Sequence, residues 1–446
     1  MELTGHVGLL PTSPVTSPVS LGDGLSGVAA THIGDLDAQQ VARMTAASYY
    51  WASPGWLAAA ERLPGHHFLH LAVKDASDRI VGLLPCQYVT DSSTPSFYDI
   101  PRMIAEGAVF GCADWLSAAE QGELTQAQAQ LTTRDLYPSL VAASPNSCCP
   151  IAFEPSLTPG ERQVVSRALL RLFTLWAADL NVVTAGALFL YPESGPELYG
   201  PLAEAFDAAG YQHVTLGGDC VLPIQRPDFD GYLARFRSSR RVAIRRERRD
   251  FAEGGFHVKI TRGAHALTDD MVGLQVSLQR KYGATQVDVA ALQETFAELR
   301  RSLGDEMVVF TAERGDTTIG YIAFCEYGDA LYARVTGFDH QVLAAHDFCY
   351  FNLVYYEPLS WAAARGLTRI HYGFATYEAK LRRGCELRRA HGYVAVAGDL
   401  ASPARTAAQI LSLSEQRRLD YVETTYGGGT AGQPGPATAT AQPAPR

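Results

Sequence analysis

One pattern occurs twice in this chain. His67–Val73 is a compact apolar run rich in β-branched and aromatic residues, and after a polar turn it is followed by a second apolar run, Ile80–Val89. Met307–Ala312 and Ile319–Glu326 repeat this order about 240 residues later, and in both cases the second run has a glycine near its start. Such pairs of short apolar runs are typical of β-hairpins. The repeat therefore predicts a duplicated domain.

Helical segments are expected between and after the two hairpins. Pro159–Leu180 carries apolar residues at helical spacing, and Leu267–Tyr282 and Val289–Leu303 continue the pattern in the second half. Asp347–Arg365 is also helical, with a kink or a fresh helix start at Pro358. Helices that alternate with hairpins predict an α/β fold with mixed, mostly antiparallel sheets.

The length of 446 residues suits two domains. We expect the first domain at residues 31–223 and the second at residues 224–425. Residues 1–30 include a Pro-, Ser- and Thr-rich stretch, and residues 426–446 consist mainly of Gly, Ala, Pro, Thr and Gln. We expect both tails to be disordered, because neither can bury enough apolar surface to offset the entropy of ordering.

The composition argues against several classes of protein and of site. Hydrophobic residues make up 47%, charged residues 19%, and the net charge is −10, which argues against non-specific coating of nucleic acid. Eight cysteines form no C-x-x-C pair or disulfide framework, so we expect reduced thiols and a cytoplasmic location. We expect no secretory leader, because residues 1–30 lack a basic start followed by an apolar run, and no membrane span, because no apolar run is long enough. The histidines lack partners at ligand spacing, so no metal site is expected.

Arginine dominates the segment Arg235–Arg249, in which eight of fifteen residues are arginine. A helix capped by Ser238 or Ser239 would place several of these like charges on one face, at a cost in helix stability. One interpretation is a solvated basic helix paired with acidic neighbours. The other is a phosphate site for tRNA, CoA or a nucleotide-linked acceptor. Its candidate residues are Arg237, Arg240, Arg241, Arg245 and Arg248.

Polar side chains also concentrate in His346–Tyr356 and Tyr372–Glu386. An amine that attacks an ester or thioester requires a cation or donor for the oxyanion and a base for the proton. Lys380 or Arg382 could supply the cation, and Glu378 or His346 the base. A structural role stays open for Lys380, His346, Tyr355 and Tyr356. The candidate substrate-binding residues are Tyr332, Arg334, Asn352, Tyr355, Tyr356, Tyr372 and Arg383.

Four of these segments resemble a known family. Arg237–Phe251, Leu278–Gly283, Phe351–Gly373 and Phe374–Gly384 are similar to motifs of the FemAB-like (peptidoglycan biosynthesis/recognition, BioF2-like) branch of the GNAT acyltransferase superfamily. The resemblance is firm over Phe229–Val394. It implies two tandem GNAT-like domains and acyl transfer to an amine.

The family's active-site loop maps onto this chain with differences. In Fem-type relatives the acyl donor is an aminoacyl-tRNA, and the lysine of their loop falls on Arg382 here, whereas the FemAB-like pattern places its lysine on Lys380. Cys385 and Glu386 depart from the Phe-Gly of Fem-type proteins. Both cations therefore remain candidates for the oxyanion. The recurrent positions of the loop are Glu378, Lys380, Leu381, Arg383 and Gly384.

The acyl donor is inferred from a missing motif. Ordinary GNAT enzymes bind CoA pyrophosphate on a Q/R-x-x-G-x-G/A loop, which follows neither Ala330–Thr336 nor the first hairpin, at Thr90–Pro101. We therefore expect no bound cofactor and a donor that is a co-substrate: aminoacyl-tRNA is favoured, with acyl-CoA or an acyl-carrier protein as the alternative. The acceptor would be a small-molecule amine in natural-product or cell-wall precursor biosynthesis. A non-catalytic binding protein on a GNAT scaffold is the alternative from another class.

Overall fold

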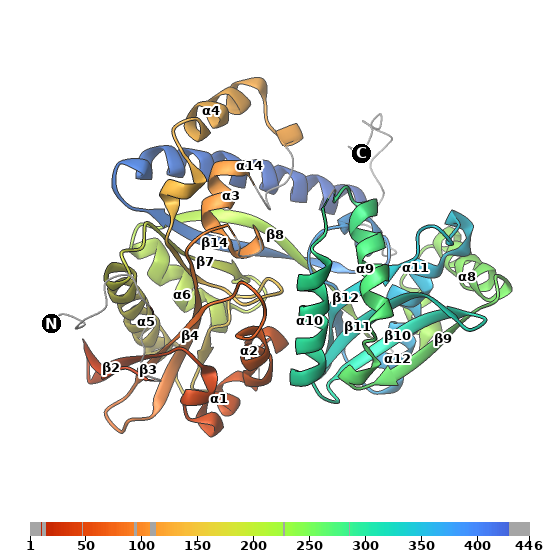
Figure 1. The fold of residues 1–446 in the computed structure, drawn as a ribbon, viewed down its shortest axis with the longest axis horizontal. Helices are drawn as coiled ribbons and strands as arrows, with labels where there is room; N and C mark the ends of the chain where they lie inside the picture. Colours follow the sequence, from red (N-terminus) through yellow and green to blue (C-terminus); the bar gives the residue numbers. More distant parts are fainter. Residues whose placement is uncertain are drawn as a thin grey trace.

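The computed structural model describes residue 10 and residues 15–46, 48–92, 96–107, 113–225, 228–284 and 286–427. Its strands form one 14-stranded mixed sheet flanked by helices (Figure 1). The strand order is β1-β2-β3-β4-β5-β7-β14-β8-β13-β12-β11-β10-β9, and β6 pairs with β4. The strands are β1 (Val19–Gly22), β2 (Leu25–Ala30), β3 (Phe68–Lys74), β4 (Ile80–Val89), β5 (Ser139–Ala142), β6 (Ala152–Phe153), β7 (Thr184–Leu190), β8 (Gln212–Pro223), β9 (Phe256–Arg262), β10 (Met307–Arg314), β11 (Thr317–Tyr327), β12 (Ala330–Phe338), β13 (Arg369–His371) and β14 (Glu386–Val396).

The helices begin and end close to the expected positions. The long helix predicted from Pro159 runs to Asp179, and Thr158 and Glu161 form a capping box at its start. The segment predicted around Pro358 contains a π-helical stretch, Asn352–Tyr356, before a fresh α-helix begins at Glu357. The helices are α1 (Ala38–Thr45), α2 (Pro54–Ala60), α3 (Ile100–Glu106), α4 (Ala118–Gln128), α5 (Pro159–Asp179), α6 (Pro196–Ala208), α7 (Phe229–Ala234), α8 (Ser238–Glu253), α9 (Asp270–Lys281), α10 (Val289–Ser302), α11 (Cys349–Phe351), α12 (Glu357–Ala364), α13 (Tyr377–Leu381) and α14 (Ala401–Tyr426).

The two halves share one strand arrangement. The predicted hairpins are the antiparallel pairs β3–β4 and β10–β11. In each half the antiparallel strands lead to a parallel pair, which is β5–β7 in the first half and β12–β13 in the second. The repeated sequence pattern therefore corresponds to a repeated fold.

The tail prediction is wrong for part of the N-terminus. Residues 19–30 form β1 and β2, and β2 pairs with β3 through contacts such as Val28 with Ala72. Val28 and Ala29 are buried, so this short apolar segment gains enough contact from the edge of β3 to be ordered. Residues 428–446 of the predicted C-terminal tail lie outside the described residues.

The halves exchange their last strands. β8 ends the first half in sequence but pairs with β13 of the second half, with Ile370 opposite Leu222. β14 ends the sheet in sequence but pairs with β7 of the first half and with β8. The predicted boundary between residues 223 and 224 therefore divides the sequence but does not divide the sheet.

The last helix also joins the halves. α14 packs against β8 and α4 and runs below α4 across the upper part of the molecule in Figure 1. Ala407 and Leu411 belong to the core of the first half, whereas Leu419 and Val422 belong to the core of the second. Throughout the described ranges, the helices are too short or too polar to cross a bilayer.

A third core cluster lies between the halves. Trp56 and Leu57 of α2 are fully buried and belong to the same hydrophobic cluster as Val272 of α9 and Phe296 of α10. Such close packing makes the relative position of the halves part of the core. Side chains from both halves can therefore form one rigid site.

Candidate active site

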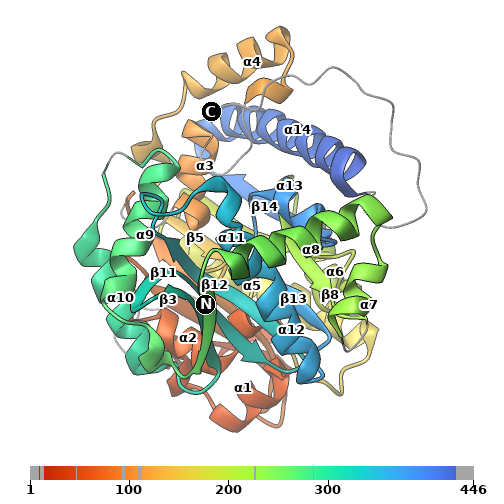
Figure 2. The ribbon, with the colours of Figure 1, turned by 90° about the vertical axis from the view of Figure 1, so that its right-hand side faces the viewer.

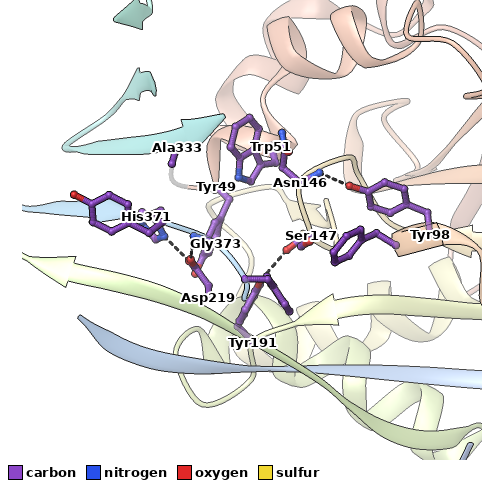
Figure 3. A pocket seen from close by; sticks show the side chains of 13 residues that line it. Tyr49, Trp51, Tyr98, Asn146, Ser147, Tyr191, Asp219, Ala333, His371 and Gly373 are labelled. Carbon is purple, nitrogen blue, oxygen red and sulfur yellow. Dashed lines mark hydrogen bonds and ion pairs between the residues drawn. The ribbon is translucent and has the colours of Figure 1, made fainter. Parts of the chain in front are cut away.

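A cavity of about 250 Å³ lies where the halves meet (Figure 3). Loops of the first half and the end of β13 supply most of its wall, and side chains at strand ends are commonly placed for ligand binding. The lining residues are Tyr49, Trp51, Phe97, Tyr98, Asn146, Ser147, Tyr191, Asp219, Ala333, His371, Tyr372, Gly373 and Phe374.

A hydrogen-bonded carboxylate and imidazole form part of this wall. Nδ1 of His371, at the end of β13, lies 2.6 Å from Oδ2 of Asp219 on β8. The Gly373 N–H donates to Oδ1 of Asp219 at 2.9 Å, and the side chains of His371 and Asp219 are 4% and 6% exposed. Nε2 of His371 has no hydrogen-bond partner in the described part of the chain. Since the carboxylate accepts from Nδ1–H, a neutral ring offers Nε2 as a proton acceptor.

The pKa of the Asp219 carboxyl is lowered by its neighbours. Burial alone would raise it, but the charge and hydrogen bond of His371, the charge of Arg388 and the Gly373 N–H together outweigh burial. Arg388 lies on β14 directly opposite Asp219 in the antiparallel register. Directly opposed residues project from the same face of a sheet. The exchanged strand β14 therefore places a cation beside the dyad.

Aromatic rings fix the plane of the imidazole. The His371 ring stacks on Tyr332 with centroids 4.5 Å apart and planes 5° apart, and Tyr49 meets it edge-on at 5.1 Å. Tyr49 in turn stacks on Tyr191 at 5.4 Å. Burial raises the pKa of the Tyr49 and Tyr191 phenols, so both stay protonated. Tyr332, predicted to bind substrate, thus lies against the imidazole.

The opposite wall contains a strained turn. Asn146 and Ser147 have φ values of 74° and 63°, in the left-handed region that non-glycine residues rarely adopt. The Asn146 N–H donates to the Tyr98 hydroxyl, and the Tyr191 hydroxyl donates to the Ser147 carbonyl at 2.7 Å (Figure 3). These two bonds hold the turn against the cavity.

Lys380 occupies a different place from the one predicted. It is 5% exposed, and Nζ donates to the carbonyls of Tyr372 at 2.9 Å, Gly373 at 2.9 Å and Phe374 at 2.6 Å. An ammonium has three N–H groups, so none remains for an oxyanion. Burial lowers the pKa of Lys380. The prediction of a catalytic cation is corrected: Lys380 positions the cavity segment that follows His371.

Three further predicted catalytic residues lie on the surface. Glu378 and Arg382 are about half exposed, at 54% and 55%, and form an i,i+4 ion pair at 3.0 Å. His346 has 83% of its side chain exposed and lies 3.8 Å from Asp347. None of the three lines the cavity around His371. The structure therefore does not bring them together with the dyad.

Several predicted binding residues form a buried network around Glu247 of α8. The Tyr356 hydroxyl donates to Glu247, and Arg383 and Arg240 donate to it at 3.2 Å and 3.4 Å. Asn352 donates to the Glu247 carbonyl at 3.0 Å. This network ties α8 to the loop around α13, and its residues have structural partners in place of substrate.

Two predicted tyrosines differ in position. Tyr355 is fully buried in the core of the second half. Tyr372 lines the cavity, although its hydroxyl donates to the Val354 carbonyl at 2.9 Å. The structure thus places Tyr372, but not Tyr355, at the site.

The arginine-rich helix α8 begins at Ser238, and Arg237 occupies the N-cap, so the predicted serine cap is wrong. Arg241 donates to the Phe236 carbonyl at 2.7 Å. Arg248 pairs with Glu357 at 3.1 Å, and Arg245 lies 3.7 Å from Asp230. Much of the arginine charge is therefore balanced by acidic neighbours. The helix lies on the outer side of the second half (Figure 2).

The sequence analysis missed the residues that carry the cavity chemistry. Asp219 stands alone in an apolar strand, and a lone acidic residue in such a run is a signal for a buried polar contact. His371 is the last residue of β13, directly after the buried Ile370. Tyr49, Tyr98 and Tyr191 reach the cavity from the first half, and no local pattern marks them.

Comparisons with known proteins agree with this architecture. Residues 123–402 match the model of the FemAB-like family, described as peptidoglycan biosynthesis/recognition. The crystal structure of FemX is similar with a TM-score of 0.50 at 9% identity, covering 80% of this chain and 96% of that one. A tandem GNAT protein from the clavulanic acid biosynthesis pathway has a TM-score of 0.46 at 14% identity, covering 85% and 98%. No curated protein matches the sequence.

The chain thus has a duplicated α/β fold, similar to that of FemX, with a cavity between its two halves. The family match spans well over half of the sequence. The chain belongs to the FemAB-like family.

Proposed function

We propose that this protein is an N-acyltransferase that joins an activated acyl group to an amine in the cavity around His371. One observation carries the proposal: Nδ1 of His371 is held by Asp219, and Nε2 is left without a partner within the described residues. That arrangement suits a general base.

The proposed reaction is attack of an amine on an activated acyl ester or thioester, with His371 as the base. The amine nitrogen attacks the carbonyl carbon of the acyl donor, and Nε2 of His371 takes the proton from nitrogen. The resulting oxyanion is stabilised by positive charge, for which Arg388 stands on the same sheet face as Asp219. Collapse of the intermediate breaks the bond to the leaving oxygen or sulfur, which receives the proton from His371.

We propose aminoacyl-tRNA as the donor. Two features support it: the CoA pyrophosphate motif is missing after both hairpins, and α8 exposes Arg245, Arg246 and Arg249, whose side chains are 59%, 66% and 60% exposed. Exposed arginines can exchange a weak carboxylate partner for phosphate.

The catalytic test uses His371→Gln. The variant and the wild type are incubated with pools of charged tRNA and a panel of amines, and amide products are measured by mass spectrometry. Loss of the base should lower turnover by about 10²- to 10⁴-fold. Wild-type turnover in His371→Gln would contradict the proposed base.

The donor test is separate. Arg245→Glu combined with Arg249→Glu should weaken tRNA binding, and wild-type affinity should fall steeply as salt rises. Arg405→Glu, a reversal at an exposed position on α14, is the matched control. Micromolar binding of acetyl-CoA, with tRNA binding unaffected by the α8 reversals, would favour an acyl-CoA donor.

A further inference from the structure

A β-bulge directs Arg334 into the space between the halves. In the β11–β12 pair, Ala323 lies opposite Val335 and Phe324 lies opposite Ala333, so Arg334 is the extra residue. A bulge commonly redirects a side chain at a functional site. The preceding residue, Ala333, lines the cavity of the dyad.

Arg334 lacks an acidic partner. Within the described residues no carboxylate forms an ion pair with it, and its Nε is enclosed without a hydrogen-bond partner. Its guanidinium carbon lies 5.1 Å from the centroid of the Trp56 ring. Part of the residue's surface stays accessible. A ligand can therefore approach a cation that the protein itself does not neutralise.

The surroundings of Arg334 add further donors. The phenols of Tyr50 and Tyr321 lie near Arg334, and the Tyr321 hydroxyl is buried without a hydrogen-bond partner in the described chain. Tyr98, which lines the cavity, also interacts with Arg334. Burial raises the pKa of each of these phenols, so they stay neutral and can donate. Arg334 thus lies among hydrogen-bond donors that suit a carboxylate.

A buried arginine elsewhere in the described chain is paired. Arg383 is 3% exposed and bonds to Glu247 at 3.2 Å. A buried charge without a partner is costly, and a contact with one ring offsets only part of that cost. Retention of an unpaired arginine directly after Ala333 of the cavity wall is therefore explained by binding of an anion.

We propose that Arg334 binds a free carboxylate of the acyl acceptor, so that the acceptor amine is of the amino-acid class. The proposal rests on the function assigned to the cavity and adds its substrate class. A planar guanidinium forms two parallel bonds to a carboxylate, with the nearby tyrosine hydroxyls as additional donors.

The first test is a binding measurement that does not depend on turnover. The probes are the common amino acids and the matching amino-acid amides, and the readout is the shift in unfolding temperature. The wild type should respond to at least one free acid and not to its amide. Arg334→Met should bind the free acid about 10- to 100-fold more weakly than the wild type. The affinity of Arg334→Lys should lie between the two, because lysine keeps the positive charge but cannot form two parallel hydrogen bonds to a carboxylate.

Stability supplies an independent readout. Arg334→Met should unfold at a higher temperature than the wild type without ligand, because it removes an uncompensated charge. Arg314→Met is the matched control, since Arg314 lies 5.0 Å from the Phe256 ring but is exposed and away from the cavity. A wild type that responds to no free acid, or an Arg334→Met variant that keeps the response, would overturn the proposal. Inorganic phosphate as a probe separates a carboxylate site from a phosphate site, and a phosphate-only response would also overturn it.

The two proposals fail in different ways. His371→Gln should lose turnover but keep the response to the free acid. Retained turnover in His371→Gln counts against the proposed base alone. Loss of the response to the free acid in Arg334→Met, in a variant that still unfolds in one cooperative transition, supports the carboxylate site alone.

Discussion

Asp219→Asn is a sharp test of the proposed base, because it preserves the shape of the site. In the wild type, Asp219 accepts from Nδ1 of His371 at 2.6 Å and from the Gly373 N–H at 2.9 Å. An asparagine can still accept from Gly373 through its oxygen, but its amide nitrogen must then donate to Nδ1. The imidazole proton is forced onto Nε2, and the lone pair that receives the amine proton is lost.

The expected magnitudes follow from these two bonds. Exchanging a charged hydrogen bond for a neutral one should lower the free energy of unfolding by about 1–2 kcal/mol. The loss of a general base should lower kcat by about 10²- to 10⁴-fold. Initial rates with charged tRNA and amine measure the change in kcat. Urea unfolding followed by circular dichroism measures the change in the free energy of unfolding.

Asp219→Ala separates tautomer control from charge. Alanine leaves a small cavity and no donor, so His371 can adopt either tautomer. We expect Asp219→Ala to be less stable than Asp219→Asn and yet more active. If Asp219→Asn keeps kcat within about threefold of the wild type, a change too small for loss of a base, the dyad is structural and the reasoning is refuted.

The same carboxylate predicts a pH dependence of stability. Its pKa is lower in the folded protein than the ordinary value of 3.8, so the native state binds fewer protons than the unfolded state. The contribution of the Asp219 carboxylate to the free energy of unfolding is therefore complete at pH values above 3.8. It is lost as the pH falls through the lower pKa that this carboxyl has in the folded protein. Unfolding free energies of wild type and Asp219→Asn should converge in that acid range.

Three further predictions concern the supports of the fold. Lys380→Met leaves three carbonyls without their donor and should cost about 2–5 kcal/mol in urea unfolding, with KM changed as the cavity wall loosens. Glu247→Gln leaves Arg383 buried without its carboxylate and should cost about 2–4 kcal/mol, while kcat is retained because the network lies outside the cavity. The Arg417 hydrogen bonds lower the pKa of Glu120 from 4.5 to about 2, so Glu120→Gln should be less stable at neutral pH, and its urea midpoint should meet the wild-type one as pH falls through that interval.

Local patterns predicted much of the fold. The hairpin β3–β4 has the expected polar turn, in which Asp75 accepts from the backbone N–H groups of Ser77 and Arg79 at 2.9 Å and 3.1 Å. Helix α5 begins at the expected residue, Pro159, with Thr158 as its N-cap. These features depend on neighbours within a few residues, which the sequence displays directly.

The exchange of β8 and β14 could not be predicted in this way. It pairs residues far apart in the chain, such as Asp219 with Arg388, and an apolar strand carries no mark of its partner. The role of Lys380 was predicted wrongly for a related reason. A lysine beside arginines in a polar segment resembles a surface cation, and only the folded chain shows Nζ turned inward to three carbonyls.

The loop that resembles the family motif supports the site, and the residues beside it carry the proposed chemistry. Lys380 holds the segment directly after His371, and Arg383 anchors the same loop to Glu247. Gly217 of β8 has a φ of 112°, and a Cβ there would meet Phe374 of that segment at 2.9 Å, so the strand approaches the loop closely two residues before Asp219. Because β8, β13 and β14 contribute Asp219, His371 and Arg388 respectively, the dyad and its cation form only when the two halves exchange strands.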